Sequence, residues 1–73
     1  STTDIETMLG HFKAAAPDAP APTAIDFVAG ELRIKGLDAS ASAIATMSAK
    51  LRPQGYSVRQ DADALLIKEE RFR

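Results

Sequence analysis

The side chains that could carry chemistry in this chain are few, and none is spaced to form a catalytic group. His11 is the only histidine and there is no cysteine, so a metal site would lack nitrogen and sulfur ligands. Asp61 and Asp63 flank one alanine, a spacing more typical of a turn that bonds its own backbone than of an acid–base pair. Glu69-Glu70 is typical of a solvated strand end. We therefore expect no enzymatic activity, no metal and no cofactor.

The serines, glycines and basic residues add no recognisable site. No partner base or nucleophile elbow accompanies the serines. The glycines punctuate turns instead of forming a phosphate-binding loop. Four basic residues are expected on the open face of a sheet, but without the aromatic pair on which RNA-binding sheets stack bases: Arg33, Lys35, Arg59 and Lys68. The pattern does not favour nucleic-acid binding.

Length and composition indicate one small domain. The chain has 73 residues, with nine Lys and Arg, ten Asp and Glu, and a net charge of −1. A chain of this size buries only about 60% of its unfolded surface, so its core is thin. The lack of cysteine excludes disulfides and a thiol nucleophile. No apolar run approaches the roughly 18 residues of a membrane span, and there is no signal peptide. Because the chain opens on Ser1-Thr2-Thr3 without methionine, we expect it to be cut from a longer protein.

The segment 24–37, AIDFVAGELRIKGL, predicts a β-hairpin on which the rest of the chain is organised. Apolar and polar residues alternate on each side of Ala29-Gly30, which indicates strands with one dry face. Pairing Val28 with Glu31 places apolar residues opposite one another and an aspartate opposite an arginine. A slip of one residue would turn an apolar row to water. The loop must therefore hold an even number of residues, two or four.

Two helices and two further strands are predicted around this hairpin. Residues 4–16 carry an apolar stripe at helical spacing and end at Pro17. His11 lies on the flank of that stripe, where a solvated histidine is expected. A proline-rich connection leads to strands 24–28 and 31–37, and residues 40–52 form the second helix. Strands 56–60 and 64–70 follow, the last one apolar on both faces.

This order of elements, αββαββ, predicts a two-layer α+β sandwich. Two amphipathic helices would cover one face of a four-stranded antiparallel or mixed sheet. Right-handed crossovers favour a ferredoxin-like arrangement, circularly permuted so that its first strand comes last. The second and fourth strands are then central and the first and third are edges, which suits Pro22 beside the first strand.

The inward faces of this sandwich are expected to be apolar throughout. Seven residues would fill the core and leave no cleft: Ile25, Phe27, Leu32, Ile34, Ile44, Met47 and Leu51. Two functions from different classes then remain. An interaction module would self-associate and need no pocket, whereas a small ligand-binding or regulatory domain would need a pocket with converging polar groups. The lack of inward polar residues favours the interaction module.

The candidate binding residues lie on the third strand, which is a predicted open edge. Its residues are Tyr56, Ser57, Val58, Arg59 and Gln60. Unpaired backbone groups on such an edge can accept a strand from a partner. The alternative is that Arg59 and the short length of the strand merely protect the edge from aggregation. Both interpretations remain open.

Several segments together resemble the periplasmic domain of the type II secretion system protein L family. They are the helix Ile5–Leu9, the alanine- and proline-rich connection, the hairpin around Gly30, and the run KLRPQGYSV at residues 50–58. The resemblance covers nearly the whole chain. Similar segments occur in protein M of the same system, in pilus-assembly relatives, and more loosely in small envelope domains of the BON type.

The resemblance implies a ferredoxin-like domain in the periplasm, without catalytic activity. Proteins of this family are tethered by one membrane helix to a cytoplasmic part that recruits the secretion ATPase, in the inner-membrane assembly platform. The domain would form weak homodimers and pair with protein M. The family offers no motif that assigns interface residues, so none is transferred to this chain.

Overall fold

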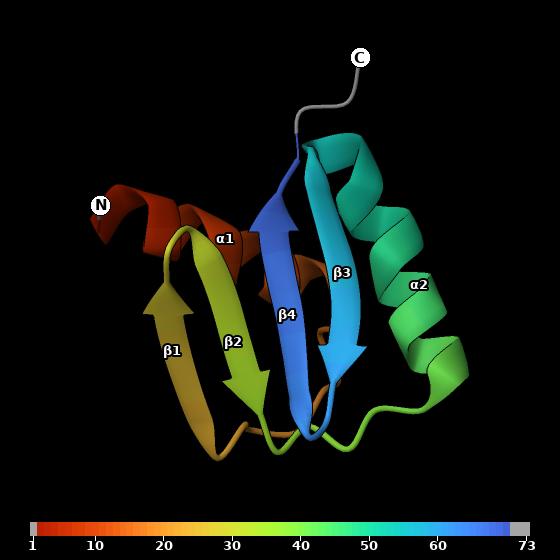
Figure 1. The fold of residues 1–73 in the computed structure, drawn as a ribbon. Coiled ribbons are helices and arrows are strands. Elements are labelled where there is room, and N and C mark those ends of the chain that lie inside the picture. Colours follow the sequence, from red (N-terminus) through yellow and green to blue (C-terminus); the bar gives the residue numbers. More distant parts are fainter. Residues whose placement is uncertain (1, 71–73) are drawn as a thin grey trace.

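Four antiparallel strands form a single sheet in the spatial order β1-β2-β4-β3 (Figure 1). The structure, a computed structural model, describes residues 2–70, and the side chains of residues 4–70. β2 and β4 are central and β1 and β3 are edges, as predicted. The sheet is wholly antiparallel, which resolves the choice between an antiparallel and a mixed sheet.

The helices and strands follow the predicted αββαββ order, and each boundary lies within two residues of the expected one. The helices are α1 (Thr2–Ala15) and α2 (Ala41–Leu51), the latter continued by the short 3-10 helix η1 (Arg52–Gln54). The strands are β1 (Ala24–Val28), β2 (Glu31–Lys35), β3 (Tyr56–Asp61) and β4 (Ala64–Glu69). α2 begins with a defined cap, because the Ser40 Oγ accepts a hydrogen bond from the Ala43 backbone amide at 3.1 Å.

The register of the first hairpin is confirmed residue by residue. Ile25 lies opposite Ile34, Phe27 opposite Leu32, and Val28 opposite Glu31. The connecting loop is Ala29-Gly30, with φ values of +52° and +77°. Two successive residues with positive φ form the turn whose twist suits adjacent antiparallel strands, and glycine at the second position allows it at little cost. Alternation of side chains and turn geometry thus specify the same pairing.

The polar pair predicted in this hairpin is opposed but does not form an ion pair. Asp26 lies opposite Arg33 in the register. Arg33 instead turns toward its own strand, where its Nε lies 3.8 Å from Oε1 of Glu31. Within the part of the chain that the structure describes, no ion pair or hydrogen bond engages the Asp26 carboxylate.

The core lies between the sheet and the two helices, which both cover the same face (Figure 1). This is the two-layer, permuted ferredoxin-like sandwich that the order of elements predicts. Four of its side chains are almost fully buried, two on β2, one on α2 and one on β4: Leu32, Ile34, Leu51 and Ile67. No polar or charged residue among those described is buried. The free energy of folding therefore comes chiefly from apolar burial in a thin layer.

Ile25 does not belong to this core, contrary to the sequence-based prediction. Its side chain is on the inner face, yet the residue is 44% exposed, and Phe27 and Ile44 are only partly buried. At the start of β1, the connection and one side of α1 stand away from Ile25 and leave a hollow between them. Ile25 consequently lines an open hollow. The expectation of a sandwich without a cleft is wrong at this edge.

The facing isoleucines of the hairpin provide a matched test of this packing. Ile34 is 0% exposed whereas its partner Ile25 is 44% exposed. Ile34→Ala should lower the free energy of unfolding by about 2–5 kcal/mol, because it leaves a cavity in a closed layer. Ile25→Ala should lower it by only about 1 kcal/mol, because nearly half of the residue's surface already faces water and the hollow beside it is open. Urea unfolding followed by circular dichroism measures both, and equal losses would contradict the described coverage of β1.

Candidate interaction edge

The predicted binding strand, β3, is an edge of the sheet. Some of its backbone groups form hydrogen bonds to β4, and the others point away from the sheet. The Glu70 amide donates to the Gly55 carbonyl at 2.7 Å, so this pair closes the β3–β4 ladder. Because hydrogen-bonded and non-bonded pairs alternate, Ser57 and Arg59 bond to β4. The backbone groups of Tyr56, Val58 and Gln60 therefore point away from the sheet.

Only part of this edge is accessible. Tyr56 is 6% exposed and belongs to the core, so its side chain is not available for contacts although its backbone groups point outward. Val58 packs partly against the same core, whereas Arg59, Gln60 and Asp61 are exposed. The tyrosine is buried because the alternation that points Val58 inward also points Tyr56 inward, toward His11 and Met8 of α1. The usable edge thus runs from Val58 to Asp61, shorter and later than predicted.

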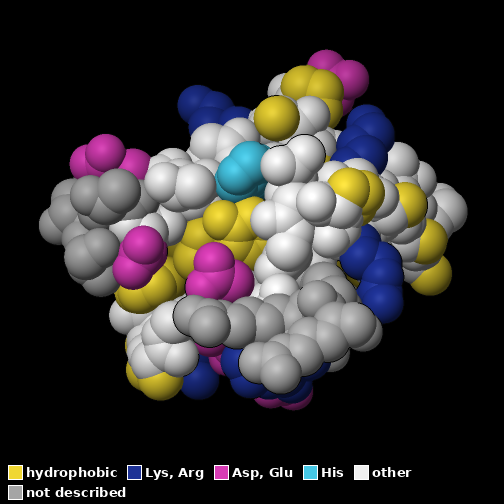
Figure 2. Space-filling model, turned by 90° about the horizontal axis from the view of Figure 1, so that it is seen from above, with side chains coloured by type: hydrophobic (Ala, Val, Ile, Leu, Met, Phe, Trp, Pro, Cys, Tyr) yellow, Lys and Arg dark blue, Asp and Glu magenta, His cyan; other side chains and the backbone are white. Residues whose placement is uncertain are grey.

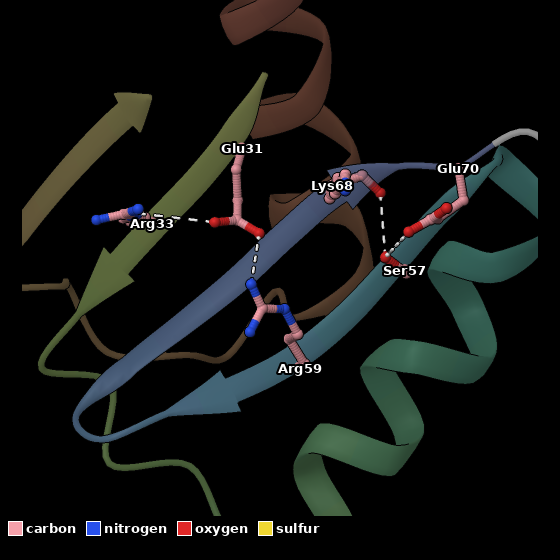
Figure 3. A network of polar contacts seen from close by, with 6 residues as sticks. All are labelled: Glu31, Arg33, Ser57, Arg59, Lys68 and Glu70. Atoms are coloured by element: carbon pink, nitrogen blue, oxygen red, sulfur yellow. Dashed lines mark hydrogen bonds and ion pairs between the residues drawn. The ribbon is translucent and has the colours of Figure 1, made fainter. Parts of the chain in front are cut away.

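The outer-face side chains of β3 are held by polar contacts across the sheet (Figure 3). Nη2 of Arg59 lies 3.1 Å from Oε2 of Glu31, reaching across β4 to β2. The Ser57 hydroxyl donates to the Glu70 carboxylate, with 3.1 Å between Oγ and Oε1. The exposed contact between Arg59 and Glu31 contributes little, about 0–1 kcal/mol, but it orients Arg59 over the sheet.

Leu66 explains why charged residues crowd this open face. It lies on the outer side of the central strand β4, yet the residue is only 4% exposed. Its register partners are Arg33 on β2 and Arg59 on β3. The long apolar stems of arginines cover hydrophobic surface while their charged ends stay in water. The four basic residues predicted for this face lie there, and their role includes covering an apolar spot.

His11 packs against Tyr56 at one end of the sandwich instead of standing in solvent. The ring centroids are 5.2 Å apart and the planes are inclined by 51°. His11 is half-buried, which the sequence-based expectation of a solvated histidine missed. Figure 2 shows this end of the molecule, where hydrophobic side chains lie in a recess with acidic side chains beside it. Tyr56 and Met8 line the small hollow there, about 150 Å³, together with Asp4 and Glu69.

The surroundings of Tyr56 raise the pKa of its phenol above the ordinary value of about 10. Burial is the main cause, because it disfavours the charged form, and the carboxylates of Glu69 and Asp4 add to it. A tyrosine held neutral in this way is a packing residue with a polar end, and not an activated acid or nucleophile.

The remaining sequence candidates do not converge on a common site. Asp61 ends β3 and Asp63 lies in the two-residue turn before β4, so they serve the second hairpin as predicted. Glu69 and Glu70 point to different partners, Tyr56 and Ser57. Among the described residues, no group of three or more acidic or histidine side chains is placed to hold a metal ion.

Another hollow lies beside α2, and the Ser40 and Thr46 hydroxyl groups in its lining are already engaged. It has a volume of about 560 Å³ and is bounded mainly by the connection after α1 and the start of α2. The Ser40 hydroxyl oxygen accepts from a backbone amide, and the Thr46 hydroxyl donates to the Ser42 carbonyl. A small-ligand site would need converging polar groups that are available to the ligand. Within residues 2–70, no helix is long and apolar enough to cross a membrane.

The sequence analysis predicted β1 as the other edge strand but named no binding residues on it. Four of its five residues are exposed and the fifth, Phe27, is half-buried. Ile25 and Val28 are the large hydrophobic residues that stand out on the described surface, at 44% and 48% exposed. β-branched residues beside a proline at a predicted edge could have signalled this surface from the sequence.

Comparisons with known proteins identify no family for this chain. The chain matches no protein-family model, no curated protein and no solved structure.

Ionisation of Tyr56 gives a test of its burial, because it is the only tyrosine in the chain. Its raised pKa means that the folded state binds the phenolic proton more tightly than the unfolded state does. The associated stability is complete below pH of about 10 and is lost as the pH rises through the folded pKa. Tyrosinate absorbance should titrate at higher pH in buffer than in urea. The Tyr56→Phe variant should lose less stability over the same alkaline range, and equal midpoints in buffer and urea would contradict the described burial.

Proposed function

We propose that this chain is a non-catalytic protein–protein interaction domain that associates through the edges of its sheet. The observation that carries the proposal is that both edge strands offer outward backbone groups, on exposed segments at Val58–Asp61 and along β1. Unpaired edges are templates for strand addition, in which main-chain hydrogen bonds supply affinity and alternate side chains supply specificity.

The β3 edge suits association with a second copy. Two β3 strands can pair antiparallel about a two-fold axis at Gln60, whose outward backbone groups then bond to each other. Because side chains alternate between the two faces, paired residues share a face only if their numbers are both even or both odd. The pairing of Gln60 with Gln60 meets this condition. It places Arg59 of each copy opposite Asp61 of the other, on the outer face. Opposite charges across strands favour this register over the one that pairs Arg59 with itself.

The wider assignment rests on the resemblance of the helix, connection and hairpin segments to the type II secretion system protein L family. On this proposal the chain is a periplasmic part of the inner-membrane assembly platform, forming weak homodimers and pairing with protein M. An interface made by so short an edge would bury on the order of 1,000 Å² or less, which is typical of transient association.

Charge reversal at Asp61 tests the self-association. Asp61→Lys would place a cation opposite Arg59 of the second copy and should weaken dimerisation by about fivefold or more. Asp63→Lys makes the same change in net charge two residues away, in the turn, and should leave dimerisation unchanged. Sedimentation equilibrium over a range of concentrations measures both. A dimer that tolerates Asp61→Lys, or a chain that is monomeric throughout, would contradict the proposed β3 dimer.

A second measurement addresses the partner. Adding the periplasmic domain of a candidate protein M should replace the homodimer with a heterodimer in the same experiment. A domain indifferent to that partner would remove the secretion-platform assignment, while leaving the self-association to be judged separately.

A further inference from the structure

The two edges of the sheet differ in what surrounds them. On β3 the exposed part is short and polar, and the inner face beneath it is occupied by α2. On β1 the whole strand is accessible, and its exposed apolar residues project on both faces, Ile25 inward and Val28 outward. A long, apolar edge strand can pair with many other strands unless a charged residue on it restricts the pairing.

An apolar groove continues the inner face of the sheet beyond β1. It has a volume of about 460 Å³ and is lined mainly by apolar side chains, with Ile25 on one side and Leu9 and Phe12 of α1 on the other. The prolines of the connection, Pro17 to Pro22, close its remaining side. A strand added to β1 would extend the sheet by about 4.8 Å, which brings its inward side chains over this groove.

The backbone groups available to such a strand are those of Ile25 and Phe27. The two-residue turn bonds the Val28 carbonyl to the Glu31 amide, so alternation directs Asp26 toward β2 and its two neighbours outward. Asp26 and the residue opposite it on an added strand therefore form a pair without backbone hydrogen bonds between them. Side chains approach most closely in such pairs. Asp26 is thus the residue of β1 whose charge a partner must match.

The same geometry disfavours pairing with a second copy. In one antiparallel register, Ile25 of each copy bonds to Phe27 of the other. This register also places Asp26 of one copy directly opposite Asp26 of the other. Moving the register by two residues in one direction would pair Ile25 with Ala29, which is in the turn with φ of +52°. Moving it the other way would pair Phe27 with Thr23, whose amide already donates to the Lys35 carbonyl. Charge therefore opposes the register in which self-pairing would form the most hydrogen bonds.

We propose that β1 is a docking edge for an extended strand of a different protein, which carries a basic residue between two apolar residues. The basic side chain lies opposite Asp26 on the outer face, and the two apolar side chains face the groove formed by Ile25, Leu9 and Phe12. The pattern is the one that β2 presents to β1 from its other side, with Arg33 between Leu32 and Ile34. The inference deepens the proposed function and rests on it, since it identifies the chemistry of the partner for one of the two edges.

Two synthetic peptides with blocked ends test this specificity. One has the sequence Ser-Thr-Leu-Arg-Val-Thr-Ser, and the control has aspartate in place of arginine. Titration into the labelled domain, followed by amide chemical shifts, should give saturable changes at Ile25 and Phe27. The arginine peptide should bind about tenfold more tightly than the aspartate peptide, because opposite charges across strands attract and like charges repel.

A charge reversal in the domain provides the reciprocal arm. Asp26→Arg should invert the preference, so that the aspartate peptide binds more tightly. Asp18→Arg makes the same change in net charge in the exposed connection and should leave the preference as it is in the parent chain. Equal binding of both peptides to the parent, an unchanged preference in Asp26→Arg, or shifts confined to β3 would each overturn the proposal.

Failure of this proposal can be told apart from failure of the proposed dimer. The Asp61→Lys variant is altered only at the β3 edge, so it should bind the arginine peptide as the parent does. A domain that dimerises but binds neither peptide retains the β3 association and loses the β1 site. A monomeric domain that discriminates the peptides retains the β1 site and loses the dimer.

Discussion

The structure depends on two helices covering one face of a four-stranded sheet that is wider than the helices can shield. The central strands receive full coverage, so Leu32, Ile34 and Ile67 are almost completely buried. The strand β1, at the margin of the sheet, is not fully covered. Ile25 is therefore 44% exposed, and a groove lies beside it. In so small a domain there is no spare element to cover that margin. The same limitation that makes the core thin therefore creates the surface that a partner can use.

The two edges are managed by different means. β3 is short in its exposed part, and its Arg59 is drawn over the sheet toward Glu31. This combination protects the edge and also supplies a charge that Asp61 of a second copy can meet. β1 has no such cover, and its selectivity rests on the one carboxylate of Asp26. Charged residues on edges are a common protection against indiscriminate pairing. If the two proposed associations occur, the position of each charge also determines which partner can pair.

Sequence reasoning succeeded where local pattern and pairing rules decide the outcome. The alternation of Ile25 and Phe27 with Leu32 and Ile34 predicts the hairpin register, and the apolar last strand predicts its central place. It failed where exposure depends on the path of a distant helix. Nothing local to Ile25 indicates that α1 leaves it uncovered. Tyr56 differs, because its alternation with Val58 in the sequence already indicates an inward side chain, which the structure places against His11.

The sheet order has a consequence for how the chain acquires its structure during synthesis. β4 is the last strand in the sequence, yet it lies between β2 and β3 and joins the two αββ halves. Until it leaves the ribosome, β3 has no strand to pair with and β2 is bonded on one side only. A nascent chain short of Glu69 thus exposes two additional unpaired strand edges, a state prone to aggregation. The domain can therefore close its sheet only after its last strand has been synthesised.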